Sequence, residues 1–153
     1  MRDFEKISFA RFKRDIKDDK ELYNEYALPS RGSKFAGGYD FHLIEDVTIK
    51  PGEIKKIPTG IKSYFESDEV LLIIVRSKMG FKYNIRLCNQ VGLIDADYYN
   101  NEDNEGHIYA MIQNEGTEER TFKKGEAIIQ GMFIKYLTTD SDNGNDVIRT
   151  SEY

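Results

Sequence analysis

The chain is poor in residues that would cross-link it or hold it in a membrane. Its 153 residues include a single cysteine and no tryptophan, so a disulfide within the chain is excluded. One thiol is also too few for a thiolate metal site, and the apolar-rich surroundings of Cys88 favour an inert, buried packing role. No apolar run approaches the roughly 20 residues that span a bilayer, and the charged N-terminus lacks the apolar core of a secretory signal. These absences predict one cytoplasmic domain that does not enter a membrane.

A basic balance is missing as well. The formal net charge is −5, whereas domains that bind nucleic acid usually carry a strongly basic face. We therefore expect no nucleic-acid partner. An anionic small molecule remains compatible with this charge, because local clusters of Lys and Arg can outweigh the net charge at one site.

Short strand-like runs fill most of the chain. They are rich in Ile, Val, Tyr and Phe, and turn residues separate them at a spacing typical of an all-β sandwich or barrel. The clearest predicted helix is 18–26, where Leu22 and Tyr26 share a face. The polar, Asn/Asp/Gly-rich segment after 137 predicts a flexible arm over 138–153 beyond a β domain over 1–137. The strand-like runs are 6–12, 39–44, 47–49, 54–61, 70–76, 83–87, 107–114, 120–122 and 126–137.

The acid Asp95 follows directly after the apolar run 91–94. Burying a carboxylate beside such a run costs several kcal/mol unless a partner compensates. An Asp held on a rigid strand suits a base that orients and deprotonates a water molecule; a turn Asp that caps backbone N–H groups is the alternative. A calcium loop starting at Asp95 is excluded, because Asn100 stands where the loop needs glycine and Gly106 where it needs a bidentate Glu.

Three further segments carry groups suited to an anion or a metal. The run 76–78, Arg-Ser-Lys, ends the most apolar strand and offers cationic and hydroxyl donors for a phosphate, although a solvated strand end would look the same. The Gly-Gly pair before Asp40 would let the backbone approach a ligand, with Asp40 facing a hydrated metal ion; a simple turn is the alternative. The basic turn 123–126, which leads to Gln130, could equally be a solvated hairpin tip.

The order and spacing of these segments resemble the homotrimeric dUTP diphosphatases (dUTPases) over about residues 28–136. The most specific part of the resemblance is NQVGLIDADY. The family implies a distorted jelly-roll barrel of the β-clip type, three chains with shared active sites, and hydrolysis of dUTP to dUMP and pyrophosphate with Mg²⁺. The matching segments are LPSRGSKFAGGYDF (28–41), IPTGI (57–61), VRSKMGFKYNIRL (75–87), NQVGLIDADY (89–98), IQNEG (112–116) and KKGEAIIQ (123–130).

The resemblance also implies a role for each matched residue. Asp95 falls on the family's water-activating Asp, which directs attack on the α-phosphorus. Asn89 falls in the hairpin whose backbone, over about 84–90, reads uracil, and Tyr98 on the tyrosine that packs against deoxyribose and leaves no room for a 2′-hydroxyl. The residues matched to phosphate binding are Arg76, Ser77 and Gln130, with Lys78 as an added charge, and the residue matched to the metal, through water, is Asp40.

The chain departs from the family pattern at several positions. Lys78 replaces a glycine of the phosphate motif, Ala127 stands where Arg is frequent, and a longer acidic loop over 99–106 replaces a tight turn. At the C-terminus, Arg149 matches the Arg of the family's closing arm and Tyr153 the aromatic that stacks on uracil. The two glycines between them and the final Gly-Ser-Thr-Gly are missing, which predicts weaker closure and reduced turnover.

Two other functions remain open. A dCTP deaminase has a related fold, but the chain lacks that family's Arg-Ser-Ser-x-x-Arg run. A non-catalytic, dUTPase-like binding or regulatory protein is compatible with the unusual C-terminus. His42 and His107 lie outside the family motifs, and both are predicted to be non-catalytic.

Overall fold

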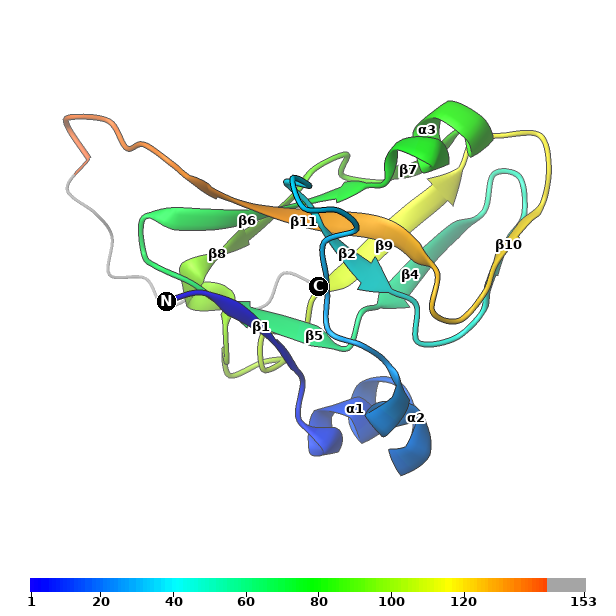
Figure 1. The fold of residues 1–153 in the computed structure, drawn as a ribbon, viewed down its shortest axis with the longest axis horizontal. Helices are drawn as coiled ribbons and strands as arrows, with labels where there is room; N and C mark the ends of the chain where they lie inside the picture. Colours follow the sequence, from blue (N-terminus) through cyan, green and yellow to red (C-terminus); the bar gives the residue numbers. More distant parts are fainter. Residues whose placement is uncertain (143–153) are drawn as a thin grey trace.

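The computed structural model describes residues 1–142, which form a β-rich fold with three short α-helices (Figure 1). The helices are α1 (Phe9–Asp15), α2 (Lys20–Glu25) and α3 (Ser77–Tyr83), and a 3-10 turn, η1, covers Ala96–Tyr98. The strands are β1 (Asp3–Lys6), β2 (Tyr39–His42), β3 (Val47–Ile49), β4 (Ile54–Pro58), β5 (Ile61–Tyr64), β6 (Glu69–Val75), β7 (Ile85–Leu87), β8 (Gly92–Asp95), β9 (Tyr109–Asn114), β10 (Arg120–Phe122) and β11 (Ala127–Lys135).

The strands pair only in antiparallel fashion within the described residues. The main sheet has the order β2-β11-β6-β8 and a second sheet the order β4-β9-β7, while β1-β5 and β10-β3 form two-stranded ribbons. Neighbouring strands in each sheet are not consecutive in sequence, as in jelly rolls. The predicted all-β, jelly-roll class is confirmed.

The main sheet has one face in the core and one face outside. On β6, Leu71 and Ile73 point inward and are 0% and 2% exposed, so Leu72 and Ile74 lie on the opposite face. Side chains directly opposite each other on paired strands share a face. We call the face that carries Leu72 and Ile74 the outer face. The inner face joins a continuous core with β4, β5, β9 and the N-terminal helices.

The N-terminal region forms two helices where the sequence predicted one. The strand predicted over 6–12 is wrong, because the chain turns into α1 after Ser8, whose hydroxyl accepts a hydrogen bond from the Arg11 N–H (3.1 Å). This N-cap outweighs the strand preference of the aromatic residues that follow. The helix predicted over 18–26 is observed as α2, capped by Asp19, with Leu22 and Tyr26 both buried.

Two other predicted strands are corrected. The strand over 54–61 is interrupted at Gly60, which has a φ of +71° and lies so close to Tyr26 that an added Cβ would be 2.7 Å from its ring. The strand over 83–87 is shortened to β7, because α3 runs through Tyr83 and ends at Asn84 in the left-handed conformation (φ 55°). No helix within residues 1–142 is long and apolar enough to cross a membrane.

Candidate active site

Three strands of one chain bring a group of polar side chains together at one end of the outer face. Register places Asp40 on β2 opposite Gln130 on β11, and Gln130 opposite Ile74 on β6, so Asp40 and Gln130 share that face. Arg76 follows β6 and lies with its Nε 3.3 Å from Asp40 Oδ1. The pair lies in an open hollow of about 490 Å³ lined by Gly32, Ser33, Ala36, Gly38, Asp40, Arg76, Ser77, Lys78 and Gln130.

The hollow contains the donor set that a polyphosphate requires. Arg76 is held in place by its backbone N–H, which donates to Ile128 O (3.0 Å), and its side chain is 40% exposed. Ser77 and Lys78 begin α3 and are both exposed. Guanidinium, ammonium and hydroxyl groups in one hollow favour binding of an anion with several oxygens. The structure places Arg76, Ser77 and Lys78 in one hollow, and their role in phosphate binding stays a prediction.

The glycine pair in the 31–38 loop has a different role from the one expected. An added Cβ on Gly38 would be 2.1 Å from Gln130 Oε1, so a larger residue would displace Gln130. The sequence had suggested close approach to a ligand, whereas the close approach in this chain is to a side chain that lines the hollow. Arg31 stiffens the loop by donating to the Lys34 carbonyl (2.8 Å), and Asp40 N–H donates to Ser30 O (2.7 Å).

Asp95 lies on the same outer face but at the far end of the sheet. It is the last residue of β8 and pairs with Val70, whereas the hollow lies beyond Ile74 on β6. Four strand residues separate these positions, or about 13 Å at 3.3 Å per residue. Asp95 stands at the N-cap position of η1, and its side chain makes no capping hydrogen bond to that turn. One chain thus does not bring Asp95 and Arg76 together.

The residues matched to base and sugar lie beyond opposite ends of β8: Tyr98 follows Asp95, whereas Asn89 precedes Gly92, which pairs with Ile73. Asn89 is exposed in the turn between β7 and β8, where Gln90 has a positive φ of 63°. Arg86 stabilises this turn, because its guanidinium donates to the carbonyls of Leu87 (3.1 Å) and Cys88 (3.0 Å). The sequence analysis missed Arg86; its only signal was a cation inside an apolar strand.

Tyr98 is almost buried at the end of η1. It is 7% exposed, and its hydroxyl donates to the backbone carbonyl of His107 (2.8 Å). Only a small part of the ring is therefore available to a ligand. Cys88 in the preceding turn is half-buried, so the expectation of a fully buried thiol is corrected.

His107 has a structural position, as expected for a non-catalytic histidine. It is fully buried, its Nδ1 lies 2.7 Å from Asp15 Oδ2, and its Nε2 accepts the Gly60 N–H (2.9 Å). Burial lowers the pKa of the His107 imidazole, and a proton on Nε2 would also break the bond from Gly60. His42 instead contacts the Ser30 hydroxyl (3.1 Å) and the Gly125 carbonyl (3.3 Å).

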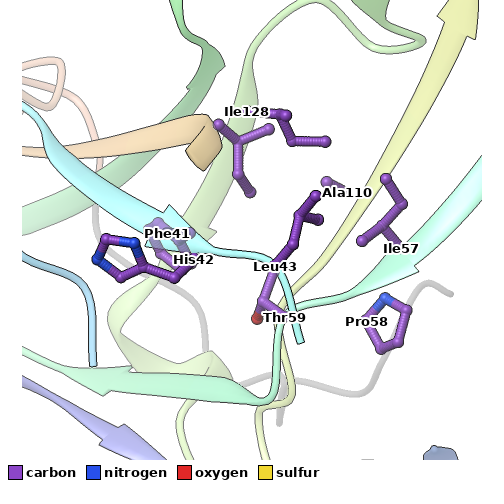
Figure 2. Close-up of a pocket in the computed structure, with 9 residues that line it drawn as sticks. Phe41, His42, Leu43, Ile57, Pro58, Thr59, Ala110 and Ile128 are labelled. Atoms are coloured by element: carbon purple, nitrogen blue, oxygen red, sulfur yellow. The ribbon is translucent and has the colours of Figure 1, made fainter. Parts of the chain in front are cut away.

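A second, apolar pocket lies between β2, β4, β9 and β11 (Figure 2). Its volume of about 10 Å³ is close to that of a single water-sized probe, so it is a packing gap and does not hold a nucleotide. The lining residues are Phe41, His42, Leu43, Ile57, Pro58, Thr59, Ala110, Ile128 and Ile129.

No group of three His, Cys, Asp or Glu side chains within residues 1–142 could hold a metal by itself. The hollow does offer the Asp40 carboxylate, whose side chain is 14% exposed and already paired with Arg76. One carboxylate beside a phosphate site fits Mg²⁺, which is usually held by one or two carboxylates together with substrate phosphates and water. Arg149 and Tyr153 lie outside the described residues, and their roles stay predictions.

Fold and site together define a class: an all-β protein whose main sheet carries, at one end, a hollow lined by Arg, Lys and Ser side chains and, at the other, a strand-borne carboxylate. The sequence model of the dUTPase family matches residues 24–153. The chain belongs to the dUTPase family, which confirms the resemblance seen in the sequence.

Individual relatives agree with this assignment. The chain is 44% identical over 119 residues to the deoxyuridine 5'-triphosphate nucleotidohydrolase of Lactococcus lactis subsp. lactis, covering 78% of this chain and 79% of that one. It is 39% identical over 121 residues to the Nautilia profundicola protein of the same name, covering 79% and 81%. The crystal structure of the dUTPase from Streptococcus mutans matches with a TM-score of 0.72 at 38% identity, over 90% of this chain and 98% of that one.

Proposed function

We propose that the protein hydrolyses dUTP to dUMP and pyrophosphate, as a dUTP diphosphatase. The observation that carries this proposal is the arrangement of one sheet face. The residues matched to phosphate binding lie in one hollow, and the residue matched to the water-activating Asp, Asp95, lies on the adjacent strand β8 at the far end of the same face. Membership in the dUTPase family supports the same activity.

In this mechanism Asp95 accepts the proton of a water molecule, and the resulting hydroxide attacks the α-phosphorus in line with the departing pyrophosphate. Arg76, Ser77, Lys78 and Gln130 hold the phosphates and offset the negative charge that moves onto the leaving group. Asp40 would hold a Mg²⁺ ion through water, and the ion would supply further charge neutralisation at the phosphates. Hydrolysis depends mainly on positioning the water molecule and the phosphates, and a rigid sheet holds the residues that position them.

Recognition of base and sugar would come from the two segments that flank β8. The backbone of the turn that contains Asn89 would read uracil, and the exposed part of Tyr98 would contact deoxyribose. Arg149 and Tyr153 would close over the nucleotide from another chain. A cytoplasmic location stays a prediction from the sequence.

Three copies of the chain would share their sites. The main support is the separation of about 13 Å between Asp95 and the hollow along β6, because a single water-activating carboxylate at that distance cannot serve a phosphate bound beside Arg76. Between the two ends the outer face carries the exposed apolar side chains of Leu93, Met132 and Ile134. A second copy of the chain would cover these side chains and place its own Asp95 at the hollow.

Two solved phage enzymes are compatible with these assignments. The dUTPase of Staphylococcus bacteriophage 80alpha was solved with dUpNHpp, and a dUTPase from phage phi11 of S. aureus contains a structural Mg(II) ion. At 18% and 17% identity they share the fold with this chain. They motivate the choice of nucleotide and metal in the test below.

The test is a comparison of substrates. The protein is incubated with dUTP, dCTP and dTTP in the presence of Mg²⁺, and pyrophosphate and ammonia are both measured. We expect pyrophosphate from dUTP alone. Ammonia from dCTP would instead establish a deaminase, and binding of dUTP without turnover would establish a nucleotide-binding protein.

A further inference from the structure

The 99–106 loop, which replaces a tight turn of the family, is an ordered structure built on two asparagines. Asn101 and Asn104 are 8% and 6% exposed. The Asn101 side chain donates to the backbone carbonyl of Tyr98 (2.8 Å) and accepts from the N–H groups of Asp103 (3.0 Å) and Asn104 (3.2 Å). The two asparagine side chains also bond each other, at 2.8 Å. Such fully bonded buried amides fix a loop in one conformation.

The loop is hydrogen-bonded to the hydroxyl of Tyr98. Asn104 Nδ2 donates to this hydroxyl (2.7 Å), while the hydroxyl donates to the carbonyl of His107 (2.8 Å). Both bonding functions of the phenol are therefore used, one by Asn104 within the loop and one by His107 directly after it. A ring bonded at its far end can neither rotate away nor shift without breaking at least one buried hydrogen bond.

At Gly106 the loop packs directly against the backbone of residues 98–100. Gly106 has a φ of +84°, and an added Cβ would be 2.8 Å from the Tyr98 carbonyl oxygen and 2.9 Å from the Asn100 nitrogen. Any side chain at this position would push the loop away from Tyr98.

The N-terminal helix anchors the loop from outside. The Glu105 carboxylate accepts from the Ser8 N–H (2.7 Å), the Ser8 hydroxyl (2.6 Å) and Lys62 Nζ (2.9 Å), and Arg11 donates to the Asp103 carbonyl (3.1 Å). Asp15 at the end of α1 holds the His107 ring. His107 and the residues on both sides of Asn104 are thus tied to α1 or its N-cap, which precede the residues that the family model matches.

We propose that the 99–106 loop positions the Tyr98 ring and thereby sets the discrimination between deoxyribose and ribose, with Asn104 as the positioning residue. The inference rests on the proposed function, in which Tyr98 faces the sugar. The Tyr98 ring can exclude the 2′-hydroxyl of ribose only if the ring does not move by about 1 Å. Displacements of this size are enough to change reaction rates. Asn104 and the His107 carbonyl provide that rigidity.

The test compares dUTP with UTP in three variants. Asn104→Ala removes the donor to Tyr98, Tyr98→Phe keeps the ring but removes both hydrogen bonds, and Glu102→Gln is the control at an exposed position of the same loop. We expect the ratio of kcat/KM for dUTP to that for UTP to fall about tenfold in the first two variants, mainly because UTP becomes a better substrate. The ratio should not change in the control.

The double variant separates positioning from simple loss of stability. If Asn104 acts through the Tyr98 hydroxyl, Tyr98→Phe combined with Asn104→Ala should lower the ratio no further than Tyr98→Phe alone. Equal losses toward both nucleotides, with an unchanged ratio, would overturn the proposal. Should Asn104→Ala fail to fold, Tyr98→Phe carries the test by itself.

Binding distinguishes failure of this inference from failure of the proposed function. The Kd values of the non-hydrolysable α,β-imido analogues of dUTP and UTP are measured for the same proteins. If the wild type hydrolyses neither nucleotide, the proposed function is wrong, and the ratio of the two Kd values still tests the loop. A wild type that binds both analogues equally well, or variants that retain its preference, would overturn the inference.

Discussion

At one end of the outer face, Asp40, Arg76 and Gln130 meet within a single chain, in a hollow open to solvent. At the other end, Asp95 and Tyr98 lie beside a loop that is bonded to the N-terminal helix. At the first end the Asp40 carboxylate is already paired with Arg76. At the second end the proposed base, Asp95, is the last residue of β8. The comparison suggests that each chain contributes two half-sites, one for the phosphates and one for the attack on phosphorus.

The largest effect is expected at the Asp95 end. Asp95→Asn should lower kcat for dUTP by about 10³-fold, because the amide cannot take a proton from water. Binding of the non-hydrolysable dUTP analogue should change little. The matched control is Asp97→Asn, two residues along and exposed, which should keep its turnover. Near-normal kcat in Asp95→Asn would show that the base lies elsewhere.

A smaller effect is expected in the hollow. Gly38→Ala should raise the KM for dUTP about tenfold with a smaller change in kcat, because the new Cβ would displace Gln130 from the phosphates. Gly80→Ala, in exposed helix α3 with no atom within 4 Å of the new Cβ, is the control and should leave KM unchanged. An unchanged KM in Gly38→Ala would remove Gln130 from the phosphate site.

The anchoring of α1 should respond to pH. Burial lowers the pKa of His107 in the folded protein, so the unfolded chain binds the proton more readily. The stability that His107 contributes is therefore complete above its unfolded pKa of about 6.5 and is lost as pH falls below it, by at most about 1.4 kcal/mol per pH unit. Urea unfolding at pH 7.5 and 5.5 measures this loss. In His107→Asn the difference between the two pH values should shrink; an equal difference would assign the pH dependence to other groups.

The smallest effect is expected where the loop meets α1. Glu105→Gln should lower the free energy of unfolding by about 1 kcal/mol, because the amide weakens the bonds from Ser8 and Lys62. Those hydrogen bonds, with the Lys62 ammonium, also keep the pKa of Glu105 below its usual value despite partial burial, which by itself raises it. Glu102→Gln serves as the control, and denaturant unfolding is the measurement. Equal stability of the two variants would show that the anchor contributes nothing.

The sequence predicted the strands better than the helices. Apolar runs such as β6 and the β3 segment are recognisable because sheet residues alternate or are fully apolar. Helices α1 and α3 were missed because each is one to two turns long and is set by its ends, Ser8 and Asn84, rather than by periodicity.

The candidate site was predictable as a list of residues but not as a geometry. Motif order identified Asp95, Arg76 and Gln130, yet no sequence pattern indicates that Asp95 and Arg76 lie at opposite ends of one sheet face. The contacts of Asp103 and Glu105 were equally hidden, since they join segments about 90 residues apart. The composition of the acidic 99–106 loop also gave no sign that Asn101 and Asn104 are buried.

The division of the site between chains is tested most directly by mixing two inactive proteins. Asp95→Asn lacks the base and Arg76→Ala lacks a phosphate ligand, so each alone should be inactive. When the two are co-assembled with different affinity tags, and mixed trimers are verified by copurification, about a quarter of the sites should combine an intact Asp95 with an intact Arg76. We predict recovery of dUTP hydrolysis to about that fraction of wild-type activity. Mixed trimers that remain inactive would contradict the shared site.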